Sequence, residues 1–289
     1  AVDQIASYVQ SAYLEQFDAL ADVKRALGRD PVVSDFVVLE RKGGKKKKRL
    51  ILNLKRSSVS AASVNKERVL LPRTLDVAWD IMELMASGRG SGKKLGLYVV
   101  DFRDAFFQIP VLPDERPFLV GRYSGKFYVY NRAAQGTRGA PLLWGRTVAL
   151  ISRLTSLLFP VDVVRMSVYV DDPIIAALGT DDELEDVFTK ILAVWLGLGF
   201  KLAFDKSQLG GDSGKVVWTS AAYTIDSANE KLTVEVKESI AAAVKGDTSK
   251  LLATNVVSLK DLREYCGRAV CMSSLLFTWR PFLSMLWAP

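Results

Sequence analysis

Two short apolar segments flank a pair of adjacent aspartates, and this arrangement constrains the fold more than any other part of the sequence. Residues 163–170 and 174–178 both read as strands, and Asp171, Asp172 and Pro173 separate them. Short apolar arms joined by turn-forming residues predict an antiparallel hairpin. A turn alone would account for two aspartates, because aspartate favours turns. The alternative is a functional site, since adjacent carboxylates repel each other unless a cation neutralises them.

The remaining segments mix helical and strand patterns, which predicts an α+β fold. Helices are expected over residues 3–27, 75–86, 139–158, 180–197 and 237–279. Strands are expected over residues 36–40, 49–54, 97–100, 126–130, 200–204, 215–225 and 231–236. The strand at 97–100 runs directly into Asp101, so a third acid stands at the end of a buried strand.

The sequence contains no histidine. This excludes serine and cysteine nucleophiles that depend on histidine, and it excludes histidine-based zinc sites. Cys266 and Cys271 fall within one predicted helix and cannot complete a four-ligand zinc site. We expect them to be reduced core residues of an intracellular protein, nuclear or cytoplasmic. An enzyme built from this chain must therefore use carboxylates, lysine, arginine or a metal held by oxygen ligands, which suits Mg²⁺ or Mn²⁺.

Positive charge is concentrated in one window, residues 41–56. The window holds nine Lys or Arg and no acid, so its charge is +9. The formal net charge of the whole chain is +7, so all other residues together carry −2. A solvated loop or a nuclear localisation signal would explain it, and so would a surface that binds phosphates. No run of 18 apolar residues occurs, so a membrane is not an expected partner.

Six segments resemble the motifs of retroelement reverse transcriptases, in the order found in that family. They are residues 48–55 (KRLILNLK), 99–110 (VVDFRDAFFQIP), 134–141 (AQGTRGAP), 169–172 (YVDD), 198–210 (LGFKLAFDKSQLG) and 259–268 (LKDLREYCGR). The sequence departs from the family at Asn53, which stands where an acid is usual, and at Lys48, which stands where an aromatic residue is usual. The segment around Trp218 also lacks the glycine of the family's primer-contacting strand. The resemblance is to retrotransposon-type polymerases.

The resemblance implies a right-hand polymerase fold with an antiparallel palm sheet backed by helices. The expected boundaries are 1–86 for the fingers, 87–112 for the first palm segment, 113–138 for the second fingers segment, 139–236 for the second palm segment and 237–289 for a helical thumb. The chain starts at Ala1 without methionine and stops just after the thumb, so we expect a piece of a longer protein with a truncated thumb.

The resemblance also implies the chemistry, which is RNA-directed synthesis of DNA. A dNMP is transferred to a primer 3′-hydroxyl with two Mg²⁺ ions, for which Mn²⁺ can substitute. Asp101 and Asp171 would bridge both ions, with Asp172 beside them and the Phe102 carbonyl completing the shell. Lys206 resembles the lysine that protonates the leaving pyrophosphate. The alternatives are a strand-end cap for Asp101 and an ordinary exposed lysine at 206.

Further positions are assigned to substrates by the same resemblance. The incoming dNTP would contact Lys46, Lys47, Lys48, Arg49, Asp104, Ala105, Phe106, Gln135 and Gly136. The ring of Phe106 would exclude a 2′-hydroxyl, although a core phenylalanine is the alternative. The DNA primer and RNA template would contact Tyr169, Val170, Trp218 and Gly267. Most lysines of the basic window are alternatively solvated or face template phosphates, and Tyr169 is alternatively a packing residue.

Three other functions remain open at this point. An inactive, domesticated palm could bind nucleic acid without chemistry, although no catalytic acid is missing. An RNA-dependent RNA polymerase shares the palm but carries a polar residue at the Phe106 position. A nucleotide cyclase is a third alternative, but the sequence has no G-G-[DE]-E-F motif. The oligomeric state is left open.

Overall fold

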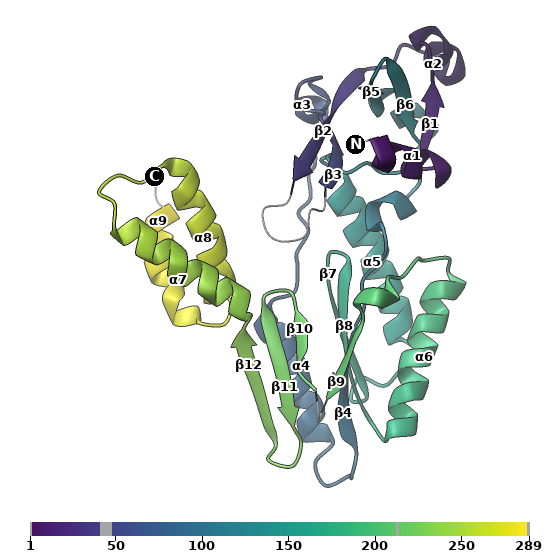
Figure 1. The fold of residues 1–289 in the computed structure, drawn as a ribbon. Helices are drawn as coiled ribbons and strands as arrows, with labels where there is room; N and C mark the ends of the chain where they lie inside the picture. The colour runs from purple at the N-terminus through teal and green to yellow at the C-terminus, as the bar shows by residue number, and fades with distance from the viewer. Residues whose placement is uncertain (1, 41–47, 212–213, 288–289) are drawn as a thin grey trace. The chain divides into compact units, whose positions relative to one another are not determined.

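The computed structural model describes residues 2–40, 48–211 and 214–287, and its elements form two compact units (Figure 1). The first unit comprises residues 1–70 and 103–148, and the second comprises residues 71–102 and 149–289. Each unit contains both helices and sheets, which confirms the α+β expectation. Among the residues described, no helix is long and apolar enough to cross a membrane.

The first unit is built on a five-stranded sheet with the order β1-β6-β5-β2-β3. The strands are β1 (Leu14–Phe17), β2 (Val33–Glu40), β3 (Lys48–Leu52), β5 (Val120–Tyr123) and β6 (Lys126–Tyr130). Only the β2–β5 pairing is parallel among the described pairs of this sheet. The helices are α1 (Val2–Gln10), α2 (Leu20–Leu27), α3 (Val59–Ala62), the 3₁₀ turns η1 (Ala105–Gln108) and η2 (Pro113–Phe118), and the start of α5 (Ala140–Ser156).

The expectation of one helix over residues 3–27 is wrong. Helix α1 ends at Gln10, and Ala12 follows in the left-handed conformation with φ +56°. Residues of β1 then pair with β6, with Leu14 opposite Tyr130. Apolar spacing alone suits a helix here, but the edge of β6 offers backbone partners and overrides it. The predicted end at residue 27 is confirmed, because Gly28 caps α2 with φ +67°.

The second unit contains a four-stranded antiparallel sheet with the order β7-β8-β4-β9 and a three-stranded sheet, β10-β11-β12. The strands are β4 (Lys94–Val99), β7 (Val164–Tyr169), β8 (Asp172–Gly179), β9 (Gln208–Gly211), β10 (Val216–Trp218), β11 (Ala221–Asp226) and β12 (Lys231–Val236). The helices are α4 (Thr74–Ser87), α6 (Asp181–Gly197), η3 (Phe204–Lys206), α7 (Glu238–Leu252), α8 (Leu259–Ser273), η4 (Phe277–Trp279) and α9 (Arg280–Trp287).

Strands β8 and β4 form the centre of the four-stranded sheet, and both of its faces are covered. On one face, Leu97, Val99 and Ile174 share a core with α4 and the three-stranded sheet. On the other face lies α6, whose Phe188 ring is 5.3 Å from the ring of Tyr98 (Figure 1). Burial on both faces fixes the register of these strands, because a one-residue slip would move every core side chain to the opposite face.

Two predicted strands of this unit differ in the structure. Residues 200–204 contribute only an isolated bridge between Leu202 and Phe102, and η3 begins at Phe204. The segment 215–225 is divided into β10 and β11 because Thr219, with φ +51°, turns the chain. A capping box starts α6, since the Glu183 amide donates to the Thr180 hydroxyl and the Thr180 amide donates to the Glu183 carboxylate.

Candidate active site

The pairing of β4 with β8 places Asp101 opposite Asp172. Val99 pairs with Ile174 in the antiparallel register, and the pairing continues beyond the end of β4. The Phe102 amide donates to the Asp171 carbonyl at 2.9 Å, and the Val100 amide donates to the Pro173 carbonyl at 3.4 Å. Asp101 and Asp172 lie between these two bonds, and opposed residues of this kind have Cβ atoms about 4.5–5.5 Å apart on the same face of the sheet.

A two-residue turn joins β7 to β8. Tyr169 pairs with Asp172, so the turn consists of Val170 and Asp171, and the expectation of a turn over residues 171–173 is wrong by one position. Val170 has φ +59°, which a β-branched residue rarely adopts. Such a conformation costs about 1–3 kcal/mol and persists only where the surrounding structure enforces it. The two paired strands impose it here and present Asp171 beside Asp172.

The Asp172 carboxyl has a pKa raised to about 6. Burial is the largest cause and the neighbouring charge of Asp171 is the second, while Lys237 and a hydrogen bond from the Thr219 backbone oppose them. Loss of a proton at this position is therefore unfavourable without a nearby cation.

Trp218 supports this strand end. Its indole Nε1 donates to the Asp172 carbonyl oxygen at 2.8 Å, and its side chain is completely buried. The buried indole supports the backbone of this segment. The predicted contact of the Trp218 strand with the primer stays a prediction. The Trp218 ring also meets Tyr169 edge to face, with centroids 6.2 Å apart, while Tyr169 itself remains 40% exposed.

The structure brings Lys206 and Asp101 together. The Lys206 ammonium forms an ion pair with Asp101 Oδ2, and its side chain is 51% exposed against 16% for Asp101. The Asp101 carbonyl accepts a hydrogen bond of 2.7 Å from the Ala203 amide, so η3 is joined to the strand end. Phe102 also fixes the end of β4, since its buried ring packs 5.1 Å from the ring of Trp195.

The described residues contain no group of three or more His, Cys, Asp or Glu side chains arranged to hold a metal ion. In this structure Asp101 is paired with Lys206. The gathering of Asp101, Asp171 and Asp172 around a shared ion pair stays a prediction. The donor chemistry nevertheless fits a divalent cation. All three side chains are carboxylates, and the pKa of Asp172 is raised first by burial and then by the charge of Asp171, both of which a bound cation would offset.

In the first unit, Gln135 and Gly136 lie against the end of β3. The Gln135 carbonyl accepts a hydrogen bond of 3.2 Å from the Leu52 amide. Gly136 has φ +108°, and a Cβ atom there would lie 2.6 Å from the Leu52 carbonyl oxygen. Only glycine suits this position. Arg49 is exposed on the same strand, opposite Leu39.

Three lysines are predicted to contact the triphosphate. Lys46 and Lys47 lie outside the described residues, and Lys48 is the first residue of β3. Their predicted contact with the triphosphate stays a prediction.

Of two adjacent phenylalanines, Phe107 belongs to the core and Phe106 does not. Asp104 adopts φ +51° and precedes η1, in which Ala105 and Phe107 are buried and Phe106 is half-buried. The ring of Phe107 is 1% exposed and packs among the aromatic residues of the first unit. This distribution favours a functional position for Phe106 over a core one.

Two tyrosines, Tyr8 and Tyr13, lie beside Asp104 and Phe107, and the sequence pattern did not identify them as site residues. The Tyr13 hydroxyl donates to Asp104 Oδ2 at 3.5 Å, across 91 positions of sequence, and Tyr8 lies close enough for Asp104 to raise its pKa. Both tyrosines fall in the segment whose apolar spacing predicts one amphipathic helix, so no linear signal marks them.

Gly267 is exposed on α8, and a Cβ atom there would meet no atom within 4 Å. This face of α8 can be approached closely, but its predicted contact with nucleic acid stays a prediction.

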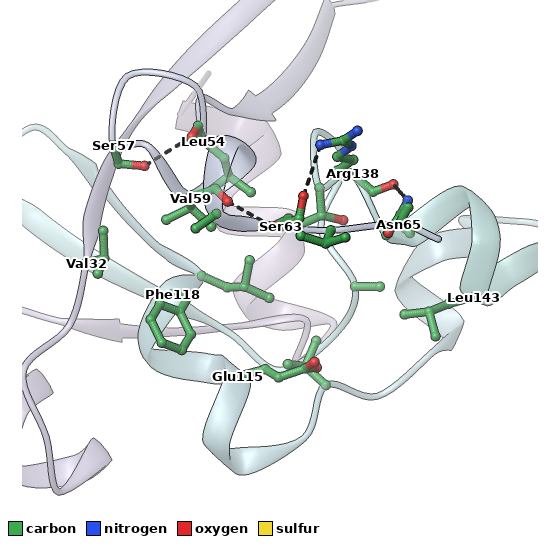
Figure 2. Close-up of a pocket in the computed structure, with 18 of the residues that line it drawn as sticks. Val32, Leu54, Ser57, Val59, Ser63, Asn65, Glu115, Phe118, Arg138 and Leu143 are labelled. Atoms are coloured by element: carbon green, nitrogen blue, oxygen red, sulfur yellow. Dashed lines mark hydrogen bonds between the residues drawn. The ribbon is translucent and has the colours of Figure 1, made fainter. Parts of the chain in front are cut away.

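A cavity of about 560 Å³ lies in the first unit, beside the segment that carries Gln135 and Gly136 (Figure 2). Arg138 borders it, with its guanidinium donating to the Ser63 carbonyl at 3.0 Å and its own carbonyl accepting from Asn65 Nδ2 at 2.8 Å (Figure 2). None of the predicted site residues lines this cavity. The carboxylates of the second unit, and not the cavity, are therefore the candidate catalytic centre.

Comparison with known proteins agrees with this geometry. Residues 41–222, more than half of the chain, match the family described as reverse transcriptase (RNA-dependent DNA polymerase). Pol polyproteins of two equine infectious anemia virus isolates, CL22 and 1369, are each 24% identical over 193 residues, which is 64% of this chain and 15% of each polyprotein. The chain thus spans a small part of these relatives.

Solved structures with the same fold include three of foamy viral protease-reverse transcriptase. One structure in complex with double-stranded DNA has a TM-score of 0.58 at 16% identity, and the match covers 90% of this chain and 38% of that one. A second such complex has a TM-score of 0.61 at 15% identity, and the match covers 92% of this chain and 46% of that one. The structure with an RNA/DNA hybrid has a TM-score of 0.60 at 16% identity and covers 91% of this chain and 29% of that one. This likeness confirms the right-hand polymerase fold. Together with the family match, it shows that the chain belongs to the reverse transcriptase (RNA-dependent DNA polymerase) family.

Proposed function

We propose that this chain synthesises DNA on an RNA template. A primer 3′-hydroxyl attacks the α-phosphate of a dNTP, a new phosphodiester bond forms, and pyrophosphate leaves. The observation that carries the proposal is the opposed pair Asp101 and Asp172, with Asp171 in the adjoining turn and Lys206 paired with Asp101. Family membership and the right-hand fold support it.

The carboxylates are proposed to hold two divalent cations, Mg²⁺ or Mn²⁺. Such ions supply charge neutralisation for an in-line displacement at phosphorus. Asp101, Asp171, Asp172 and the Phe102 carbonyl would hold these ions. Lys206, whose side chain is 51% exposed, donates a proton to an oxygen of the departing pyrophosphate.

Substrate binding is proposed for the residues of the first unit. Arg49 offers the triphosphate several donors in a fixed geometry, since the guanidinium group is planar. Gln135 and Gly136 line the base and sugar, and Phe106 excludes a 2′-hydroxyl. Foamy viral relatives are solved with double-stranded DNA and with an RNA/DNA hybrid, which supports a primer and template as partners here.

The finer assignments follow the family resemblance. We propose fingers over residues 1–86 and 113–138, a palm over 87–112 and 139–236, and a thumb over 237–289. We also propose an intracellular role in retrotransposon replication.

Primer extension on an RNA template with Mg²⁺ tests the function. Asp101→Asn keeps the shape of the side chain but removes its charge, so we expect a loss of about 100-fold or more in the rate of incorporation. Asp182→Asn, an exposed acid on α6, serves as the matched control and should retain the wild-type rate.

Three outcomes would contradict the proposal. They are a wild-type rate in Asp101→Asn, extension with rNTPs in preference to dNTPs, and binding of primer-template by a wild-type chain that never extends it. The second would indicate an RNA polymerase, and the third would indicate a binding protein without chemistry.

A further inference from the structure

The N-terminal segment of the first unit lies against the residues that carry Phe106. Tyr13 is 6% exposed, and its ring stacks on Phe107 with centroids 4.7 Å apart and planes at 3°. Its hydroxyl donates to Asp104 Oδ2 at 3.5 Å. One side chain therefore contacts both the residue that precedes η1 and the core residue within η1.

Tyr8 completes the contact from the end of α1. Its ring lies 4.7 Å from Phe107 at 47° and 6.1 Å from Tyr13. Its pKa is raised by burial, by Asp104 and by Tyr13, and lowered by Arg49. The phenol is thus within electrostatic reach of two residues proposed to bind the nucleotide.

Tyr13 is itself held firmly. Its amide donates to the Tyr8 carbonyl and its carbonyl accepts from the Asn131 amide, both at 2.9 Å. Phe107 also stacks on Tyr130, with centroids 6.4 Å apart and planes at 7°. The stack connects the N-terminal segment, η1 and β6, so a movement of η1 would disrupt contacts on both sides.

The geometry of Asp104 explains why its side chain matters. Asp104 adopts φ +51°, its carbonyl accepts the Phe107 amide at 2.8 Å, and its carboxylate makes no capping bond to η1. The Tyr13 hydroxyl therefore restrains a left-handed residue from which η1 starts, and η1 determines where the Phe106 ring stands.

We propose that Tyr13 is a positioning residue for discrimination against ribonucleotides, acting through its hydrogen bond to Asp104 and its stack on Phe107. This inference rests on the proposed function, because Phe106 is taken as the residue that meets the sugar. Selection against a 2′-hydroxyl depends on small displacements of that ring, and such displacements are controlled by the residues that support it.

Tyr13→Phe tests the inference because it removes the hydroxyl and leaves the stacking ring. In single-nucleotide incorporation on an RNA template, we expect the KM for the dNTP to rise about 3- to 10-fold, the range that corresponds to the removal of one hydrogen bond. The kcat should change less than about twofold, and the ratio of rNTP to dNTP efficiency should rise. Tyr128→Phe, in the same aromatic core, is the matched control and should behave as wild type.

A double-mutant cycle with Asp104→Ala separates positioning from general stability. If the hydrogen bond carries the effect, Tyr13→Phe adds nothing to the change in the ratio that Asp104→Ala causes by itself. A lower melting temperature with unchanged KM and ratio in Tyr13→Phe would overturn the inference while leaving the proposed function intact. A wild-type chain that incorporates no dNTP would overturn both.

Discussion

At the scale of single residues, the candidate site depends on which side chains are buried and which are not. Asp172 is partly buried beside another acid, and its pKa is raised to about 6. Phe107 is core, whereas its neighbour Phe106 is half-buried. The same residue types thus have different roles, set by the environment that the fold provides.

Asp172→Asn should stabilise the metal-free protein. An unfolded aspartate titrates near pH 3.9, so between about pH 4 and pH 6 the folded state binds the extra proton. Stability contributed by that proton is present at low pH and is lost as the pH rises through about 6. Asparagine removes this dependence, and at pH 7.5 in EDTA we expect a gain of up to about 2 kcal/mol after allowance for solvent screening.

Thermal unfolding followed by circular dichroism at several pH values checks this. The exposed control Asp182→Asn should leave the melting temperature unchanged. A lower melting temperature for Asp172→Asn at pH 7.5 would refute the assignment of an unfavourable ionised carboxyl.

Phe106→Ala should admit ribonucleotides. Removing the ring opens space at the sugar, so we expect incorporation of rNTPs to rise by about 10-fold or more relative to dNTPs. Phe118→Ala, which removes another partly exposed phenylalanine from a 3₁₀ turn of the same unit, is the control. Competition between dATP and ATP in primer extension measures the ratio, and an unchanged ratio would exclude Phe106 as the selecting residue.

At the scale of elements, the candidate site residues lie at strand ends and in tight turns. The β7–β8 hairpin forces Val170 into φ +59° and places two acids side by side. In the first unit, the loop at Gly136 approaches β3 so closely that a side chain has no room. Both arrangements need an unusual backbone conformation, which the paired strands enforce.

Gly136→Ala should lower the free energy of unfolding much more than Gly125→Ala does. Both glycines have positive φ, +108° and +78°, but a Cβ atom at 136 would meet the Leu52 carbonyl at 2.6 Å and one at 125 would meet nothing within 4 Å. We expect about 1 kcal/mol of destabilisation at 125 from backbone strain alone and about 2 kcal/mol more at 136. Urea unfolding of the two variants gives the difference, and equal destabilisation would show that the loop can move away from β3.

At the scale of the whole molecule, the charge is distributed unevenly along the chain. Residues 41–56 carry +9 while all the others together carry −2. We propose that this basic segment contacts phosphates, and such contacts release counterions when they form.

Binding of an RNA/DNA primer-template should therefore weaken steeply with salt. Replacing Lys45, Lys46, Lys47 and Lys48 with glutamine should flatten the slope of log K against log[salt] by about 0.9 for each phosphate that the protein no longer neutralises. Replacing Lys190 and Lys215, which are already paired with Asp186 and Glu235, should change the slope little. Fluorescence anisotropy from 50 to 400 mM KCl, about the range over which such slopes are resolved, provides the measurement. An unchanged slope in the quadruple variant would place the phosphate-binding surface elsewhere.

The sequence by itself determined the features that depend on neighbouring residues. Helical patterns marked α4, α5 and α6, and the acids between apolar arms marked the β7–β8 hairpin. These signals are local because caps and turns are satisfied within a few residues. The motif order also identified the family.

Only the tertiary structure decided how distant residues meet. It showed the register that opposes Asp101 to Asp172, the pairing of Lys206 with Asp101, the burial of Trp218 and the bond from Tyr13 to Asp104. It also interrupted the helix predicted over residues 3–27 with β1, because the open edge of β6 outweighed local propensity. Strand register and long-range contacts follow from the packing of a shared core, which no local pattern of this sequence encodes.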